Sequence, residues 1–327
     1  MSIFVSLLLI YTNVLIAPII VYFIWNAIGC LYLGGKFPIK EKGDFMKIIH
    51  MIDDFEILCK ESRELGSFEA YKRYTMKYSE LFNGILKGLY MTQLENLKPM
   101  IDSRDFQKSL KIAENNYEND IVQKIINLVE EVASLLNFKE HFDIYLGLEL
   151  GNIGGFSGPN PKGRPFIYIG LDRVIDQSFL RYFIPHEMNH MVRAHTIKGI
   201  NMFDFMERTI TEGLGSFCPI ALYNMEYTVD IISNSLNLPS KEVSRLIDDA
   251  DLLIDEITGE FGSILTQDKM KKYFTWSESD KDNKHYLSGY YVGMEIIKRL
   301  VGIGYDFAKL TIMPSECIWE KYKAITL

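Results

Sequence analysis

Cysteine, histidine and tryptophan are scarce in this chain of 327 residues, which contains 4, 6 and 3 of them respectively. The cysteines are Cys30, Cys59, Cys218 and Cys317, and no two of them form a C-x-x-C pair. This spacing fits neither a disulfide framework nor a thiolate zinc site, because both need paired cysteines. We therefore expect the cysteines to be small buried side chains without chemistry.

Positive charge is also in short supply. The chain has 35 Lys and Arg against 43 Asp and Glu, a formal net charge of -8. Binding to nucleic acid needs clustered basic side chains against the phosphates, so we exclude nucleic acid as a partner. Low-complexity segments and internal repeats are absent as well, and 48% of the residues are hydrophobic. The chain must therefore build a sizeable core, in one large or two medium domains.

Charge is missing altogether from the N-terminal stretch between Ser2 and Gly35. This apolar run exceeds the roughly 18–20 residues that cross a bilayer, so residues 1–35 are predicted to be a membrane segment in contact with lipid. Pro18 allows one kinked helix or a hairpin of two half-length helices. The alternative is a very apolar core helix. A cleaved signal is disfavoured because the basic n-region and the A-x-A site are missing.

The topology of this segment is predicted from the lysines that follow it. Lys36, Lys40, Lys42 and Lys47 come after the run, and only the terminal amine precedes it. The positive-inside tendency therefore places the rest of the chain in the cytoplasm.

The next part, residues 36–140, is predicted to be a helical subdomain. Apolar side chains recur there at helical spacing, first at Phe45, Ile48, Ile49, Ile52 and Phe55, and again at Ile121, Ile125, Ile126, Val129 and Val132. Such stripes are typical of core faces, so we attach no chemistry to them.

Two short β-prone runs follow, at residues 142–146 and 165–170. A loop rich in Gly, Pro and Asn, residues 151–163, separates them, and they are predicted to pair in a small sheet. The segment from Arg164 to Gly170 could be an edge strand that holds an extended peptide, or an ordinary buried strand. Beyond it the pattern is helical almost to the end, with Pro239-Ser240 predicted to start a helix over residues 241–257.

The most informative residues are His186, Glu187 and His190, which form an H-E-x-x-H sequence. Residues four apart on a helix lie on one face, so two imidazoles can bind one metal ion from adjacent turns. Glu187 is rotated about 100° from His186 and can act as the general base that takes a proton from water. Pro185 directly precedes the motif, and we expect it to start or kink the helix there.

A catalytic zinc needs a third protein ligand, and Glu212 is our candidate. It lies 22 residues after His190 (212 − 190), which leaves room for a turn and an antiparallel helix. Gly213 and Gly215 would allow two helices to approach closely around the ion. The alternative for Glu212 is a solvated helix charge, which its apolar neighbours disfavour.

Other acidic and imidazole side chains near the motif are given supporting roles. Glu207 and Asp204 fall on the same predicted helix as Glu212 and are candidates for contacts around the ligands. His195 lies five residues after His190, but Met-Val-Arg-Ala at 191–194 lacks the glycine of the metzincin turn. We therefore interpret His195 as a structural or helix-end residue.

An oxyanion donor is sought in the segment from Gly289 to Gly293, where Tyr290 and Tyr291 begin a late predicted helix. A tyrosine hydroxyl could stabilise the oxyanion of a carbonyl addition, and Tyr290 is our candidate. Packing is the competing interpretation, because the chain has 19 tyrosines and aromatic side chains are common in cores.

Four motifs together resemble a known family. They are His186-Glu187-x-x-His190, Glu212-Gly213-Leu214, Gly289-Tyr290-Tyr291-Val292-Gly293 and Met313-Pro314-Ser315-Glu316. From Leu146 to its end the chain resembles the bacterial predicted zinc-dependent protease family of the YjaZ type. The resemblance implies a gluzincin-like arrangement, with one Zn²⁺ on His186, His190 and Glu212 and with Glu187 as base. This chain differs from thermolysin-like enzymes at one position beyond the ligand glutamate, because it has Ser216 where they have Asp.

The sequence thus predicts an α+β, predominantly helical protein, a gluzincin-like zincin whose small sheet precedes the H-E-x-x-H helix. Residues 141–327 would be the zinc metallopeptidase-like domain, anchored in a bacterial cell membrane and acting on a peptide or protein. One alternative is a membrane-bound binding or scaffold protein with a structural or relic zinc site. Another is a metal-dependent hydrolase that acts on other carbonyl substrates.

Overall fold

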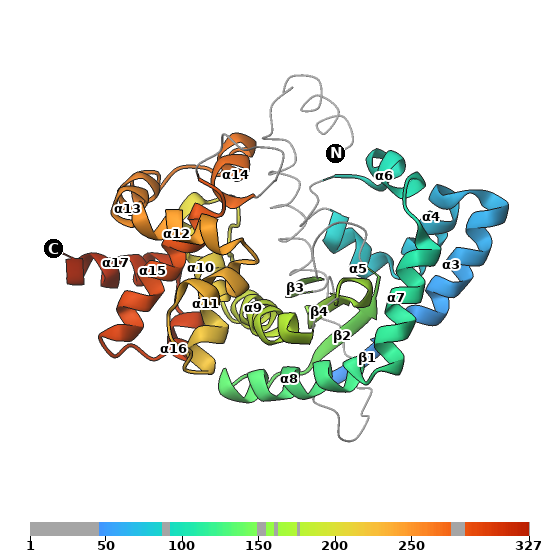
Figure 1. The fold of residues 1–327 in the computed structure, drawn as a ribbon, viewed down its shortest axis with the longest axis horizontal. Helices are drawn as coiled ribbons and strands as arrows, with labels where there is room; N and C mark the ends of the chain where they lie inside the picture. The colour runs from blue at the N-terminus through green and yellow to red at the C-terminus, as the bar shows by residue number, and fades with distance from the viewer. Residues whose placement is uncertain are drawn as a thin grey trace, which may run out of the picture. The chain divides into compact units, whose positions relative to one another are not determined.

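The computed structural model describes residues 46–86, 92–148, 155–159, 163–174, 177–275 and 285–326 (Figure 1). The described residues form an α+β structure that is mostly helical, as predicted. The predicted membrane segment, residues 1–35, and Cys30 lie outside these ranges. None of the helices within them is long and apolar enough to cross a membrane.

The described strands form one four-stranded sheet. Its strands are β1 (Met46–His50), β2 (Phe142–Gly147), β3 (Gly155–Pro159) and β4 (Pro165–Gly170), in the order β1-β2-β4-β3. β1 and β4 both pair with β2 in parallel, and β3 pairs antiparallel with β4. The predicted pairing of the runs at 142–146 and 165–170 is therefore confirmed, with Ile144 opposite Ile167. β2 and β4 are almost wholly buried, as strands covered on both faces are.

One expectation for the sheet was wrong, and one alternative is decided. Met46–His50, predicted as the start of a helix, is a strand, because pairing with β2 outweighs a helical pattern of only a few residues. Of the two interpretations of β4, the ordinary buried strand is confirmed, since β4 lies between β2 and β3. Among the described strands the two edges are β1 and β3, and β3 falls in the segment predicted to be a loop. A Cβ at Gly155 would lie 2.7 Å from the Phe183 ring, so this glycine lets β3 approach the next helix closely.

The helices before β2 differ in length, and several of them pack around aromatic side chains. They are α3 (Ile52–Leu65), α4 (Ser67–Lys77), α5 (Ser79–Gly84), η2 (Leu94–Leu97), α6 (Lys98–Asp102), α7 (Phe106–Glu118) and α8 (Ile121–Leu135). α3 packs against α4 and α7. Phe55 makes edge-to-face contacts with Tyr74 and Phe106 across this group, at centroid distances of 5.5 and 5.6 Å. The stripe predicted on α8 is thus a core face, whereas the first stripe is a helical core face only at Ile52 and Phe55.

The remaining helices follow β4. They are η3 (Leu171–Arg173), α9 (Gln177–Thr196), α10 (Phe205–Leu222), α11 (Val229–Leu236), α12 (Ser240–Asp248), α13 (Ala250–Gly259), α14 (Gln267–Phe274), α15 (Ser288–Gly302), α16 (Phe307–Thr311) and α17 (Ser315–Thr326). The helix predicted over 241–257 starts at Ser240 as expected, but it is interrupted at Asp249.

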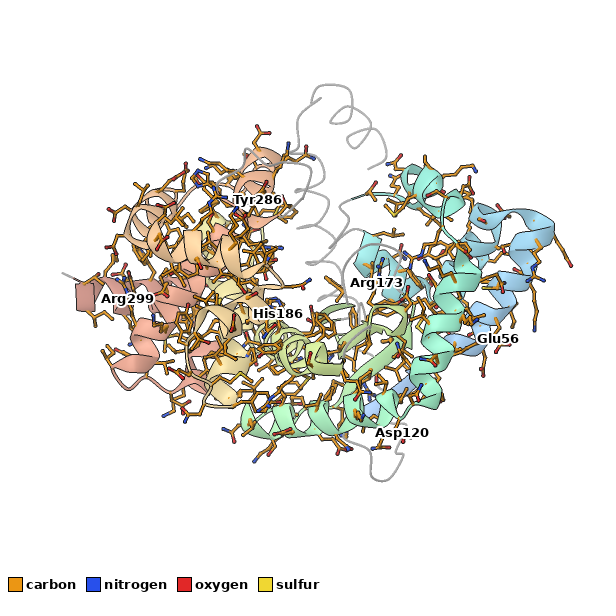
Figure 2. The ribbon with its side chains drawn as sticks, in the orientation of Figure 1. Glu56, Asp120, Arg173, His186, Tyr286 and Arg299 are labelled. Carbon is orange, nitrogen blue, oxygen red and sulfur yellow. The ribbon has the colours of Figure 1, made fainter. Side chains whose placement is uncertain are left out.

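α9 connects the sheet to the C-terminal helices. It packs on β3 and β4 and also against α8 and α10, and α10 in turn packs on α15 (Figure 2, where His186 labels α9). Residues on both sides of position 140 belong to one compact unit, because β1 contributes a strand to the sheet.

The cysteines are only partly as predicted. Cys59 and Cys218 are buried, whereas Cys317 is exposed on α17, so the expectation of burial was wrong for Cys317. Its helix packs through Ser315, Ile318 and Tyr322, and Cys317 falls on the other face.

Candidate metal centre

Helix α9 carries the H-E-x-x-H residues. This helix begins at Gln177, and Pro185 is buried in its interior. The expectation that the proline starts the helix was therefore wrong. His186 and His190 lie one turn apart and point the same way, with their Nε2 atoms 2.9 Å from each other. Their rings are nearly perpendicular, at 86°. Two nitrogen donors therefore converge on one point beside the helix.

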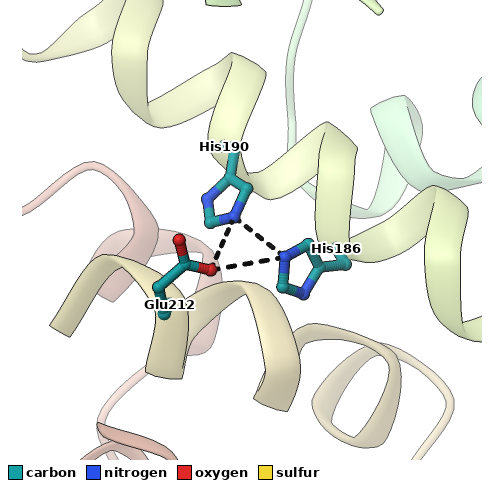
Figure 3. A group of neighbouring side chains, drawn as sticks. All are labelled: His186, His190 and Glu212. Carbon is teal, nitrogen blue, oxygen red and sulfur yellow. Dashed lines mark hydrogen bonds and ion pairs between the residues drawn. The ribbon is translucent and has the colours of Figure 1, made fainter. Parts of the chain in front are cut away.

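Glu212 completes the cluster from the facing helix α10 (Figure 3). Its Oε2 atom lies 3.2 Å from His190 Nε2 and 3.6 Å from His186 Nε2. Asp204 caps the start of α10 by accepting a hydrogen bond from the Glu207 amide, so the helix begins two turns before Glu212. The structure thus brings together the three residues that the sequence analysis selected as ligands.

Two glycines make this convergence sterically possible. A Cβ at Gly215 would lie 2.9 Å from His190 Cε1 and 3.0 Å from His186 Cε1. A Cβ at Gly213 would lie 2.2 Å from the carbonyl carbon of Gly293 on α15. Gly215 therefore leaves room for the imidazoles against α10, and Gly213 lets α15 press against the opposite side of the same helix.

The three side chains fit a metal ion. Ligands that are each about 2.0–2.1 Å from a tetrahedral ion lie roughly 3.3 Å from one another, and the three observed separations bracket this value. Glu212 Oε2 is buried and has no hydrogen bond of acceptable geometry within the described part of the chain, so a bound cation would satisfy it. Two imidazoles and one carboxylate are a donor set that zinc and related divalent metals accept.

The electrostatics favour an ionised Glu212. Burial by itself would raise the pKa of this carboxyl group, but the positive charge of Arg208 and the two imidazoles hold its pKa well below the ordinary value. Arg208 Nη2 lies 2.9 Å from Glu212 Oε1. For His186, burial opposes protonation, but the Glu212 and Glu187 carboxylates nevertheless raise its pKa. An ionised Glu212 carboxylate beside the two imidazoles therefore favours a positive charge at this point, either a proton or a metal cation.

Glu187 lies on the β3 side of α9. Its Oε2 atom accepts a hydrogen bond of 2.8 Å from the Ser157 hydroxyl on β3. Glu187 is mostly buried, and the negative charge of its carboxylate contributes to raising the pKa of His186. Sequence reasoning missed Ser157, because β3 was predicted to be a loop and a lone serine carries no pattern.

Of the two tyrosines considered as oxyanion donors, only Tyr290 lies at the cluster. Its ring stands nearly parallel to that of His186, at a centroid distance of 6.5 Å. Burial raises the pKa of its hydroxyl group, and Glu212 raises it further while Arg208 opposes this. Tyr291 instead interacts with Glu295, and burial raises the pKa of Tyr291 too. The structure thus separates the two candidates.

The other candidates lie outside the cluster. Asp204 is the helix cap described above, and Glu207 pairs with the buried Arg193 at 2.9 Å. His195 lies in the last turn of α9, where it packs edge-on against Phe138. Ser216, which stands where thermolysin-like enzymes have Asp, is buried, and its hydroxyl has no hydrogen-bond partner among the described residues. The charged residue beside the ligands is Arg208, which the sequence analysis did not select.

The sequence analysis also missed Arg193, a buried side chain on α9 that makes many hydrogen bonds. It donates hydrogen bonds to the Thr211 hydroxyl, the Glu207 carboxylate, the Ser315 hydroxyl and the carbonyls of Thr311 and Met313. Three of these partners lie in the C-terminal segment before and at the start of α17. The Met313-Pro314-Ser315 motif thus anchors α9 through this arginine.

Searches against protein-family models, curated proteins and solved structures returned no match to this chain.

Proposed function

We propose that this protein is a zinc metallopeptidase with a gluzincin-like arrangement of ligands. The observation that carries the proposal is the convergence of His186 Nε2, His190 Nε2 and Glu212 Oε2 within 3.6 Å of one another, with Glu187 on the next position of the same helix. A metal site that is purely structural has no need of this additional carboxylate. The resemblance to the YjaZ-type predicted zinc-dependent proteases supports the same function.

The proposed reaction is hydrolysis of a peptide bond. A zinc ion in this site would lower the pKa of a water molecule and polarise the substrate carbonyl. Glu187 would accept the proton of the attacking water and deliver it to the leaving amine. The Ser157 hydroxyl, 2.8 Å from Glu187 Oε2, holds the base in position. Tyr290, beside His186, is the candidate to stabilise the oxyanion.

The edge of the sheet supports a peptide as substrate. β3 is one of the two edge strands of the described sheet and packs on α9, and Ser157 connects it directly to the general base. An extended peptide that added to this edge would be held by main-chain hydrogen bonds close to Glu187. We therefore propose β3, and not β4, as the strand that would receive the peptide.

We further propose that the enzyme is anchored in a bacterial membrane through residues 1–35, with the catalytic part in the cytoplasm. The uncharged run from Ser2 to Gly35 and the lysines that follow it support this arrangement.

The first experiment is metal stoichiometry by elemental mass spectrometry on the full-length protein purified in detergent. We expect close to one zinc per chain in the wild type and a sharp loss in Glu212→Ala. A peptide-library cleavage assay would follow, in which Glu187→Gln should keep its zinc but lose hydrolysis. Absence of zinc from the wild type after reconstitution would refute the proposal, and full activity of Glu187→Gln would refute the role of the base. If the wild type binds zinc but cleaves no peptide, the result would favour one of the two alternatives, a binding or scaffold protein with a structural zinc or a hydrolase that acts on other carbonyl substrates.

A further inference from the structure

Arg208 lies one helical turn before the ligand Glu212 on α10, on the same face of the helix. Its Nη2 atom is 2.9 Å from Glu212 Oε1, and only 19% of its side chain and 5% of that of Glu212 are exposed. Ion pairs between residues four apart on helices are common on surfaces, where they contribute little. This pair is buried, and one of its members faces the metal cluster.

The two carboxylate oxygens of Glu212 contact different partners. Oε1 faces Arg208, whereas Oε2 faces the Nε2 atoms of His186 and His190. A carboxylate can bind a metal through one oxygen or through both. With Oε1 occupied by a guanidinium group, the geometry leaves only Oε2 for the ion.

Arg208 is itself held from two further helices. Its guanidinium carbon lies 5.9 Å from the centre of the Phe274 ring on α14, within the range of a cation–π contact. The positive charge of Arg208 also acts on Tyr290 of α15, the tyrosine that stands beside His186, where it opposes the rise in the pKa of the hydroxyl group. Phe274 is fixed in turn by Gly289, where a Cβ would lie 2.5 Å from the ring. The guanidinium group thus lies between Glu212 of its own helix and the Phe274 ring of α14.

We propose that Arg208 is the positioning residue of the metal centre. It fixes Glu212 as a one-oxygen ligand, with Oε2 left to face the imidazoles. The proposal rests on the proposed function, because it assumes that the cluster binds zinc. It adds a task that no part of the H-E-x-x-H or E-G-L sequence encodes.

The test measures zinc affinity, by competition with a chromogenic chelator, in full-length wild type, Arg208→Gln and Arg208→Lys. We expect Arg208→Gln to bind zinc about 10–100-fold more weakly, as is usual when a group that orients a metal ligand is lost. Arg208→Lys keeps the charge and should recover part of this loss. The absorption spectrum of the Co²⁺-loaded protein should also change in both variants, because Glu212 is free to rotate.

The matched control is Arg104→Gln. Arg104 also forms a buried ion pair, with Asp172 at 2.6 Å and side-chain exposures of 14% and 2%, but neither residue belongs to the metal cluster. Its removal should leave zinc affinity and the Co²⁺ spectrum unchanged. Circular dichroism of each metal-free variant checks the fold. If Arg208→Gln does not fold, the Co²⁺ spectrum and zinc affinity of Arg208→Lys decide the question.

The outcomes separate the two proposals. Weaker zinc binding and an altered Co²⁺ spectrum in the Arg208 variants, with wild-type values in Arg104→Gln, would establish the positioning role. Wild-type affinity and spectrum in the Arg208 variants would overturn it while leaving the zinc site intact. An equal loss in Arg104→Gln would also overturn it, since the effect would then be one of general stability. A wild type without zinc would instead refute the proposed function itself.

Discussion

Gly213 and Gly293 bring the backbones of α10 and α15 into contact. A Cβ on Gly213 would lie 2.2 Å from the carbonyl carbon of Gly293, and a Cβ on Gly293 would lie 2.1 Å from the carbonyl oxygen of Thr209. No side chain separates the two helices at this crossing. Gly213 directly follows the ligand Glu212, and Gly293 lies one turn after Tyr290. The crossing therefore determines how the ligand and the tyrosine meet.

Replacing Gly293 by alanine should force these helices apart. The new methyl group can be accommodated only by backbone movement, so we expect a loss of about 1–3 kcal/mol in the free energy of unfolding, together with weaker zinc binding. Urea unfolding and chelator competition measure the two effects. Gly302→Ala is the matched control, because it lies in the same helix and a Cβ there meets nothing within 4 Å. Equal stability of the two variants would contradict this account of the crossing.

Gly215 offers a separate test, because it faces the imidazoles. In Gly215→Ala the methyl group would lie 2.9 Å from His190 Cε1 and 3.0 Å from His186 Cε1, so both rings must shift. Ligand distances tolerate only about 0.2 Å of error, and we expect zinc affinity to fall by about 10-fold or more. Gly259→Ala, in open space on α13, should bind zinc like the wild type. Unchanged affinity in Gly215→Ala would show that the imidazoles do not need this glycine.

The sequence analysis found the three clustered side chains because their signals are local. The spacing of His186 and His190 follows from helix geometry alone, and the small residues beside Glu212 indicated a close helix crossing. Arg208 carried no such signal. A charged residue one turn from an acidic one is ordinary on a helix surface, and only the packing of α14 and α15 around it makes this pair a buried one.

The sequence predicted two of the four strands of the sheet and missed the other two. The strands at 142–147 and 165–170 are buried apolar runs, and their pairing was predicted. β1 was not, because five residues do not distinguish a helical from an extended pattern, and its partner β2 begins 96 residues later in the chain (142 − 46). The Gly- and Pro-containing β3 gave a turn signal, so Ser157 and this edge strand of the sheet were missed.

The cysteines should differ strongly in reactivity. Burial raises the pKa of the Cys59 thiol to about 11 and that of Cys218 well above its ordinary value, so neither forms much thiolate at pH 8. Cys317 is exposed on α17. We expect a maleimide at pH 8 to label Cys317 within minutes and Cys59 and Cys218 only after denaturation, as read by peptide mass spectrometry. Labelling of Cys59 in the native protein at a similar rate would contradict the burial of α3.

Arg193 is expected to be the most costly single charge to remove. It is fully buried, and its carboxylate partner Glu207 is nearly so. Arg193→Met would leave that carboxylate buried without a counter-charge, which typically costs about 3–5 kcal/mol of unfolding free energy. Arg245→Met, which breaks the more exposed pair with Glu242, should cost no more than about 1 kcal/mol.

The double variant Arg193→Met/Glu207→Gln separates the two components of this cost. Glutamine removes the uncompensated charge, so the double variant should be more stable than Arg193→Met in urea unfolding. It should still be less stable than the wild type, because the carbonyls of Thr311 and Met313 have lost their donor. If the double variant were as unstable as the single one, the loss would come from the C-terminal anchor and not from the buried charge. The measured difference therefore shows how firmly the segment before α17 holds the helix that carries His186 and His190.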